Sequence, residues 1–230
     1  MCAQRASGWG RNRVLRVFLA GVLGAGLIAV PAARSDPQTC PPTCDRIPAA
    51  AWIEPWAIPM NTTHHWPRPA QVAVPVPAPR FKFEEICATP PPRDDPRSFA
   101  VAARAAVASP PGRWNLQAQV LHWRGDTGQG GAWAMQVHDA AVAALRSCQV
   151  SAPQYSPTLT TADDGRFAAV ISGPHVVHQY LIADPFNSSV SELVLWTTPG
   201  PDVAWPLVPD DRVLDALEAA LCGAYLASCG

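Results

Sequence analysis

The sequence predicts an α+β fold, an antiparallel sheet covered on one face by helices, with a proline-rich irregular N-terminal segment before it. Three observations carry this prediction. Fourteen of the 26 prolines fall between residues 36 and 93, four strand-like runs follow one another between 157 and 198, and apolar stripes at helical spacing flank those runs. Hydrophobic residues make up 48% of the 230 positions, which is enough for a substantial core.

The first 35 residues have the three parts of a secretory signal peptide. Four arginines precede an apolar run of 14 residues at 17–30, and small residues follow at 31–35. A spanning helix needs about 20 apolar residues, so we expect cleavage, after Ser35 or Ala32, and no stable membrane span afterwards. Unpaired arginines favour the Sec route. The expected location is the cell envelope or the extracellular space.

Loss of this leader changes the charge balance. It removes five arginines and no acidic residue, so Lys+Arg falls from 17 to 12 against 18 Asp+Glu, a formal charge of about −6. Binding to phosphates needs the opposite sign. Nucleic acid and anionic membrane surfaces are therefore poor candidate partners.

Six cysteines remain in the mature chain, and an even number in an exported protein predicts disulfides. They are Cys40, Cys44, Cys87, Cys148, Cys222 and Cys229. Six cysteines allow 15 connectivities. Cys40 and Cys44 could alternatively form half of a zinc knuckle, but no second close Cys/His pair matches it. We therefore expect up to three disulfides, no metal and no cofactor.

Residues 36–93 are too rich in proline for a helix or a central strand, because proline fixes φ and lacks an amide donor. We expect this segment to run as extended polyproline or irregular coil. The same residues include Trp52, Trp56, Trp66, Phe81 and Phe83. A free linker does not normally contain such large apolar groups. We therefore expect the segment to wrap over the folded part and to be held by at least one disulfide, with one edge strand at 81–87.

The compact domain is predicted at residues 94–230. Asp95-Pro96 suits a helix start, with an alanine-rich helix up to Ala108. Alternation at 115–120 predicts a strand, and a glycine-rich loop at 125–131 leads into a helix at 133–148 with Cys148 on its inward face.

A meander of four strands is expected next. Asp164-Gly165 is a hairpin signal between 157–162 and 166–172, and further turns separate 176–183 from 190–198. A closing helix opens at Asp210-Asp211, and its leucines should lie across the sheet.

Several short patterns could carry chemistry. The loop at 125–131 could hold an anion at the helix start, but it lacks the Lys-Ser/Thr pair of a phosphate loop, so a flexible connection is the preferred interpretation. Arg124-Gly125-Asp126 matches the tripeptide that integrin ligands display, but three-residue matches are common by chance. His175 and His178 should point to opposite sides of a strand, and His138 and Asp139 are adjacent in a helix and should not face each other.

Two functional hypotheses follow. No Gly-x-Ser-x-Gly, His-Glu-x-x-His or Ser-x-x-Lys motif is present. The first hypothesis is an exported, disulfide-stabilised binding or sensor-like protein for a small molecule or an envelope protein. Trp52, Trp56 and Trp66 would be its binding residues, or else the clamp that holds the proline-rich segment. The second is a secreted hydrolase with a spatially assembled Ser/His site.

Arginine makes up 16 of the 17 basic residues, alanine is abundant, and the mature end would begin Asp36-Pro37. In these features the chain resembles exported proteins of GC-rich actinobacteria, mycobacteria in particular. Residues 95–230, in which Cys148 ends a helix before a strand meander, are similar to the extracellular sensor domain of a mycobacterial serine/threonine kinase and its lipoprotein relatives. The proline-rich front and the absence of a lipid-bearing cysteine depart from that family, so no ligand site is carried over.

Overall fold

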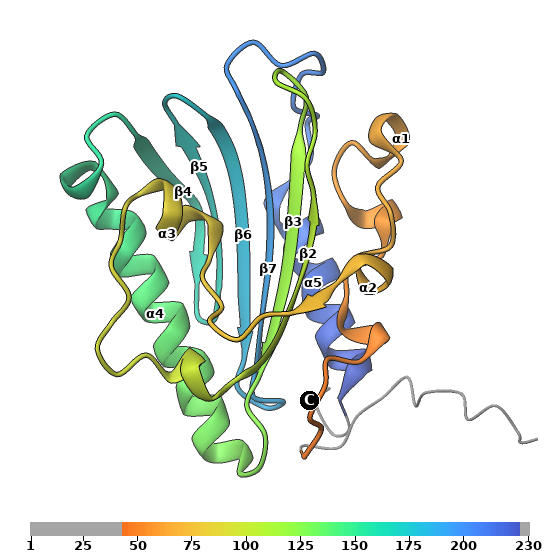
Figure 1. Cartoon of the computed structure of the whole chain (residues 1–230), viewed down its shortest axis with the longest axis vertical. Helices are drawn as coiled ribbons and strands as arrows, with labels where there is room; N and C mark the ends of the chain where they lie inside the picture. The colour runs from red at the N-terminus through yellow and green to blue at the C-terminus, as the bar shows by residue number, and fades with distance from the viewer. Residues whose placement is uncertain (1–42, 226–230) are drawn as a thin grey trace, which may run out of the picture. The chain divides into compact units, whose positions relative to one another are not determined.

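A seven-stranded antiparallel sheet forms the centre of the computed structural model, which describes residues 43–225 (Figure 1). The strand order is β1-β2-β3-β7-β6-β5-β4. The strands are β1 (Val74–Pro75), β2 (Val101–Val107), β3 (Asn115–His122), β4 (Ser156–Asp163), β5 (Arg166–Ser172), β6 (Val176–Asp184) and β7 (Ser189–Thr197). The α+β class and the antiparallel sheet are thus confirmed.

The meander of β4 to β7 follows the sequence signals. Helix α4 (Thr127–Ser151) leads from β3 to β4 at the far edge of the sheet, and the meander returns until β7 pairs with β3. At the β4–β5 turn Gly165 has a φ of +77°, and a Cβ there would lie 2.8 Å from the Ala183 carbonyl oxygen. The Asp-Gly turn therefore occurs where the dipeptide predicted it.

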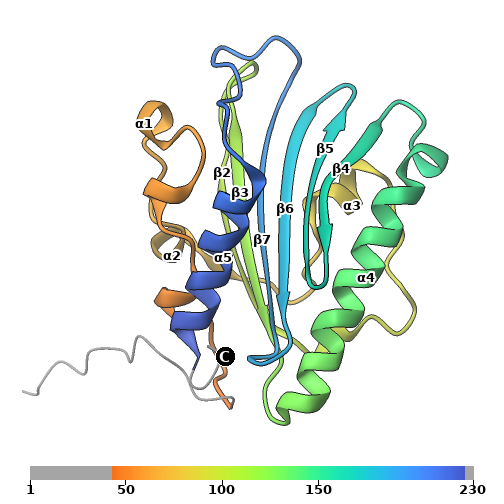
Figure 2. The same cartoon turned by 180° about the vertical axis from the view of Figure 1, so that it is seen from behind.

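The long helices cover opposite faces of the sheet, whereas the sequence predicted one covered face. Helix α4 packs on one face through Val137, Ala141 and Leu145, and α5 (Asp210–Ala224) packs on the other through Leu214, Leu217 and Leu221 (Figures 1 and 2). The physical reason lies in the central strands. In β7, Val190 and Val194 face the α4 side while Leu193 and Leu195 face the α5 side, so both faces need cover.

The proline-rich segment wraps over the sheet as expected, but as short helical turns instead of extended chain. These are η1 (Ala49–Ala51), η2 (Pro55–Ala57), α1 (Asn61–His64), α2 (Pro69–Val72) and α3 (Lys82–Ile86). Proline occupies the first position of η2 and α2, where its missing amide costs nothing. Residues 49–66 pack on the α5 side, and Phe81 and Phe83 pack on the α4 side.

Two local predictions were wrong. The predicted edge strand at 81–87 is instead helix α3 with its two caps, because the Glu84 carboxylate accepts a hydrogen bond from the Phe81 amide (2.7 Å) and closes a helical turn. The alanine-rich stretch is helical only at η3 (Pro96–Phe99), which Asp95 caps, and then becomes β2. Pairing along the whole of β3 outweighs the weak helix propensity of a few alanines.

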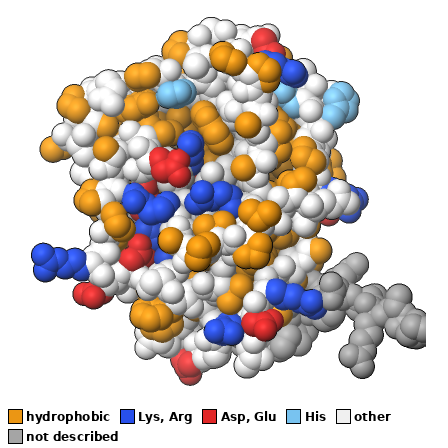
Figure 3. All heavy atoms as spheres, in the orientation of Figure 1, with side chains coloured by type: hydrophobic (Ala, Val, Ile, Leu, Met, Phe, Trp, Pro, Cys, Tyr) orange, Lys and Arg blue, Asp and Glu red, His pale blue; other side chains and the backbone are white. Residues whose placement is uncertain are grey.

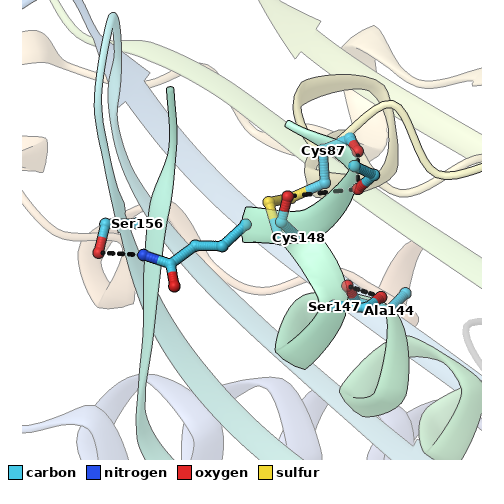
Figure 4. Close-up of a disulfide and its surroundings, with 7 residues drawn as sticks. Cys87, Ala144, Ser147, Cys148 and Ser156 are labelled. Atoms are coloured by element: carbon cyan, nitrogen blue, oxygen red, sulfur yellow. Dashed lines mark hydrogen bonds between the residues drawn. A yellow bond between two sulfur atoms is a disulfide. The ribbon is translucent and has the colours of Figure 1, made fainter. Parts of the chain in front are cut away.

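A disulfide between Cys87 and Cys148 joins the proline-rich segment to the end of α4 (Figure 4). Their Cα atoms are 4.9 Å apart, and the Ser151 hydroxyl donates to the Cys87 carbonyl (2.6 Å). The predicted covalent attachment of the segment is confirmed. Cys44 and Cys222 are also disulfide-bonded. The leader and its cleavage points, Cys40 and Cys229 lie outside the described residues.

No helix between residues 43 and 225 is both long and apolar enough to cross a membrane.

Candidate functional site

The three predicted tryptophans do not form a common site. Trp52 and Trp66 are 5% exposed and lie in the core on the α5 side, whereas Trp56 is 72% exposed. The Trp66 indole N–H donates to the Pro59 carbonyl (2.9 Å), and its ring stacks on His64. Trp52 and Trp66 therefore have the positions of a clamp on the proline-rich segment, while Trp56 faces solvent.

The interpretation of residues 125–131 as a flexible connection was wrong, because Asp126 caps α4 and the helix begins at Thr127. Asp126 caps the helix by accepting a hydrogen bond from the Gln129 amide (2.7 Å). A Cβ at Gly130 would lie 2.5 Å from the Ser188 hydroxyl oxygen, and one at Gly131 would lie 2.3 Å from the Pro185 carbonyl oxygen. These two glycines let the helix approach the β6–β7 connection closely. The exposed Arg124-Gly125-Asp126 sequence is the capping turn itself.

The histidines occupy different environments. His175 and His178 lie on opposite sides, as expected: His175 bonds to the Tyr155 hydroxyl (3.1 Å), and His178 stacks on Trp205 with ring centroids 3.5 Å apart. The expectation that His138 and Asp139 do not face each other was wrong, because the His138 Nδ1 lies 3.1 Å from the Asp139 carboxylate. No group of three or more His, Cys, Asp or Glu side chains within residues 43–225 could hold a metal ion.

A Ser/His pair of the kind that the hydrolase hypothesis requires lies where β3 ends beside β7. His122 Nδ1 is 3.1 Å from the Ser189 hydroxyl oxygen, and the two residues are opposite each other in the strand register. Both are almost completely buried, and Tyr225 stacks on the His122 ring. The Ser189 hydroxyl also donates to the Asn187 carbonyl (3.2 Å). The pair therefore holds the strand ends together.

Carboxylates from separate elements converge on a cavity of about 660 Å³, here called the acidic cleft. Asp164 comes from the β4–β5 turn, Asp184 from the end of β6, and Asp215 and Glu218 from α5. Apolar lining comes from Met135, Ile182 and Phe186. The Phe186 side chain is 71% exposed.

One cation, Arg166, lines the acidic cleft. Its guanidinium is 2.8 Å from the Asp215 carboxylate and 3.0 Å from that of Glu218. Both of these carboxylates are more than half exposed, so water weakens the two ion pairs. Four carboxylates against one guanidinium leave the lining with a formal charge of −3.

Asp184 is fixed in the cleft wall by its neighbours. It accepts hydrogen bonds from the Phe186 amide (2.9 Å) and the Asn187 side chain (2.7 Å), which shape the turn into β7. Burial raises the pKa of the Asp184 carboxyl, and the charge of Glu218 raises it further. The charge of Glu218 thus disfavours ionisation of Asp184, and a bound cation would relieve this repulsion.

The sequence marks only two of these four carboxylates, Asp164 and Asp184, and only as residues of predicted turns. Asp215 and Glu218 fall inside the predicted closing helix, where no local signal distinguishes them. Their convergence depends on α5 packing beside β5 and β6, which no short motif encodes. Comparison with known proteins finds no match among family models, curated proteins or solved structures.

Proposed function

We propose that this protein is an exported binding protein of the cell envelope or extracellular space whose acidic cleft captures a basic group. The carrying observation is the excess of carboxylates over cations in a cavity of about 660 Å³ with an exposed phenylalanine among its lining residues. Ligand cavities commonly combine apolar walls with a few convergent polar groups. The Cys87–Cys148 disulfide supports export, because disulfides persist in oxidising compartments.

The chemistry of the lining defines the ligand class. Asp164, Asp215 and Glu218 can accept charge-assisted hydrogen bonds from an ammonium or guanidinium group. The exposed ring of Phe186 can contact the aliphatic part of the same ligand or the cation itself. A primary amine or guanidinium on a short apolar stem, free or as a side chain of a polypeptide, fits this combination.

The hydrolase hypothesis has less support. A Ser/His site needs access to substrate, and neither Ser189 nor His122 lines the acidic cleft or the other cavities described for this chain. The acidic cleft in turn has no serine, threonine or histidine in its lining. Binding is therefore the better proposal.

The test is an NMR titration of the full mature protein with arginine amide, using citrulline amide as the uncharged control. We expect shifts at Phe186 and Glu218 with arginine amide only. The variant Asp215→Asn/Glu218→Gln should bind roughly three- to tenfold more weakly, since exposed charge pairs contribute up to about 1 kcal/mol each. Asp94→Asn, which removes an exposed carboxylate outside the cleft, should bind normally. Equal shifts with citrulline amide would rule out recognition of the cation. A basic peptide that binds more tightly than arginine amide would identify a polypeptide ligand.

A further inference from the structure

A cluster of polar side chains lies buried on the α4 side of the sheet, where the surrounding core is apolar. Glu192 at the centre of β7 has no exposed surface, and Gln117, Gln119 and Gln179 from the neighbouring strands are almost as fully buried. The Glu192 carboxylate accepts hydrogen bonds from Gln117 (3.1 Å) and Gln179 (3.1 Å). It also accepts one from the backbone amide of Lys82 at the start of α3 (2.8 Å).

The residues Arg80–Lys82, here called the latch segment, close this cluster. Arg104 on β2 donates to the Arg80 carbonyl (2.6 Å) and to the Gln119 side chain (2.8 Å). Phe81 lies in the core between these two polar contacts. The Gln119 side chain also donates to the Arg80 carbonyl (3.4 Å). Side chains of β2, β3 and β7 thus bind the backbone of the latch segment, and Glu192 binds its last residue, Lys82.

The charges around Glu192 do not neutralise it. Arg104 on β2 is the cation whose charge acts on it, but that guanidinium is bonded to Gln119 and Arg80. The Lys82 ammonium is paired with Glu85 (2.7 Å) and lies over the Trp196 ring, while Arg80 is paired with Glu84. Basic side chains also gather near the middle of this face in the view of Figure 3. Within residues 43–225, Glu192 forms no ion pair.

Complete burial without an ion pair favours a neutral Glu192 carboxyl, because the charged form loses its hydration there. The Gln179 side-chain oxygen is buried and has no hydrogen-bond partner while its nitrogen donates to Glu192. The same nitrogen also donates to the Tyr180 carbonyl (3.3 Å), which fixes the orientation of the Gln179 amide. Burial raises the pKa of Glu192 to about 7, against the lowering effect of its three hydrogen bonds.

We propose that Glu192 is a proton-operated latch, whose neutral carboxyl holds the latch segment on the sheet and whose ionisation favours opening of that segment. Opening admits water to the carboxyl, so the open state has an ordinary glutamate pKa while the closed state has a raised one. The closed state is therefore favoured fully below about pH 4.5, and this preference is lost as the pH rises through about 7. Phe83 and the Cys87–Cys148 disulfide keep the rest of the segment attached.

The test is hydrogen exchange of the full mature protein between pH 5 and pH 8, corrected for intrinsic rates. We expect the opening constant of Arg80–Lys82 to rise by roughly tenfold or more over this range, following linkage. Glu192→Gln, which cannot ionise, should remove the rise, whereas Glu85→Gln on the outer side of α3 should retain it. A rise of equal size in Glu192→Gln, or no rise in the wild type, overturns the proposal.

A second measurement does not depend on the variant's folding. The carboxyl ¹³C shift of Glu192 in the wild-type protein should titrate near neutral pH. A midpoint below pH 5 would show that the buried carboxyl is ionised across the whole range, and the latch would then be excluded.

Discussion

At the scale of single residues, close backbone approach explains a motif that resembled a ligand loop. Gly130 and Gly131 lie in the first turns of α4 where Ser188 and Pro185 of the β6–β7 connection contact the helix. Glycine is required at such positions because any side chain would overlap its neighbour. The sequence shows four glycines between 125 and 131 but not the connection they contact, so their packing role could not be inferred from it.

Gly131→Ala should be strongly destabilising. Its Cβ would meet the backbone oxygen of Pro185, which cannot move as a flexible side chain can, and overpacking typically costs about 1–3 kcal/mol. Urea unfolding should show this loss of unfolding free energy. Gly128→Ala is the matched control in the same helix, because the nearest atom there is the Asp126 carboxylate at 3.2 Å. Equal stability of the two variants would contradict the packing role.

At the scale of elements, the reliable predictions were those that local chemistry determines. The Asp164-Gly165 turn formed as predicted, and the alternation at 115–120 lies in β3. The predicted helices correspond to α4 and α5, although α4 begins at Thr127 instead of 133. The predictions failed where contacts with residues far along the chain determine the secondary structure. β2 is a strand because β3 lies beside it, and α3 is helical because the Glu84 carboxylate closes its first turn and binds Arg97 through two hydrogen bonds.

The disulfide between α3 and α4 should make a large contribution to stability. It closes a separation of 61 residues, for which the chain-entropy relation gives about 4 kcal/mol, in the upper part of the usual range. Cys87→Ser/Cys148→Ser should therefore unfold at clearly lower urea concentration than the wild type. The double variant is preferable to chemical reduction, because Cys44 and Cys222 are also disulfide-bonded. A midpoint within error of the wild-type value would mean that the noncovalent contacts of α3 suffice.

At the scale of the whole molecule, the sheet is buried on both sides by segments from both ends of the described chain. The α5 side receives residues 49–66 together with α5, and the α4 side receives Phe81 and Phe83 together with α4. This arrangement buries titratable groups on both faces, Glu192 on the α4 side and His178 on the α5 side. It also brings α5 beside the β4–β5 turn to form the acidic cleft, a long-range outcome that alternation and turn signals do not specify.

His178 and Glu192 should act oppositely on stability as the pH changes. Burial lowers the pKa of His178 to about 4, so between pH 6.5 and 4 the unfolded chain binds the proton more readily and this histidine destabilises the fold as the pH falls. Glu192 has a raised pKa, so its effect over the same range is to stabilise the fold as the pH falls. The two contributions offset each other, so the wild-type stability should vary less between pH 4.5 and 6.5 than that of a variant lacking one of the two groups.

Variants that lack one of the two groups should reveal how the other changes the unfolding free energy with pH. His178→Phe retains a ring that can stack on Trp205 but cannot titrate, so its unfolding free energy should rise as the pH falls from 7 to 4.5. In Glu192→Gln, His178 still titrates and residue 192 does not, so the unfolding free energy of this variant should fall over the same interval. Urea unfolding at pH 4.5, 5.5, 6.5 and 7.5 measures both slopes. Slopes of the same sign in the two variants would show that other groups control the pH dependence, since each variant retains the group that the other lacks.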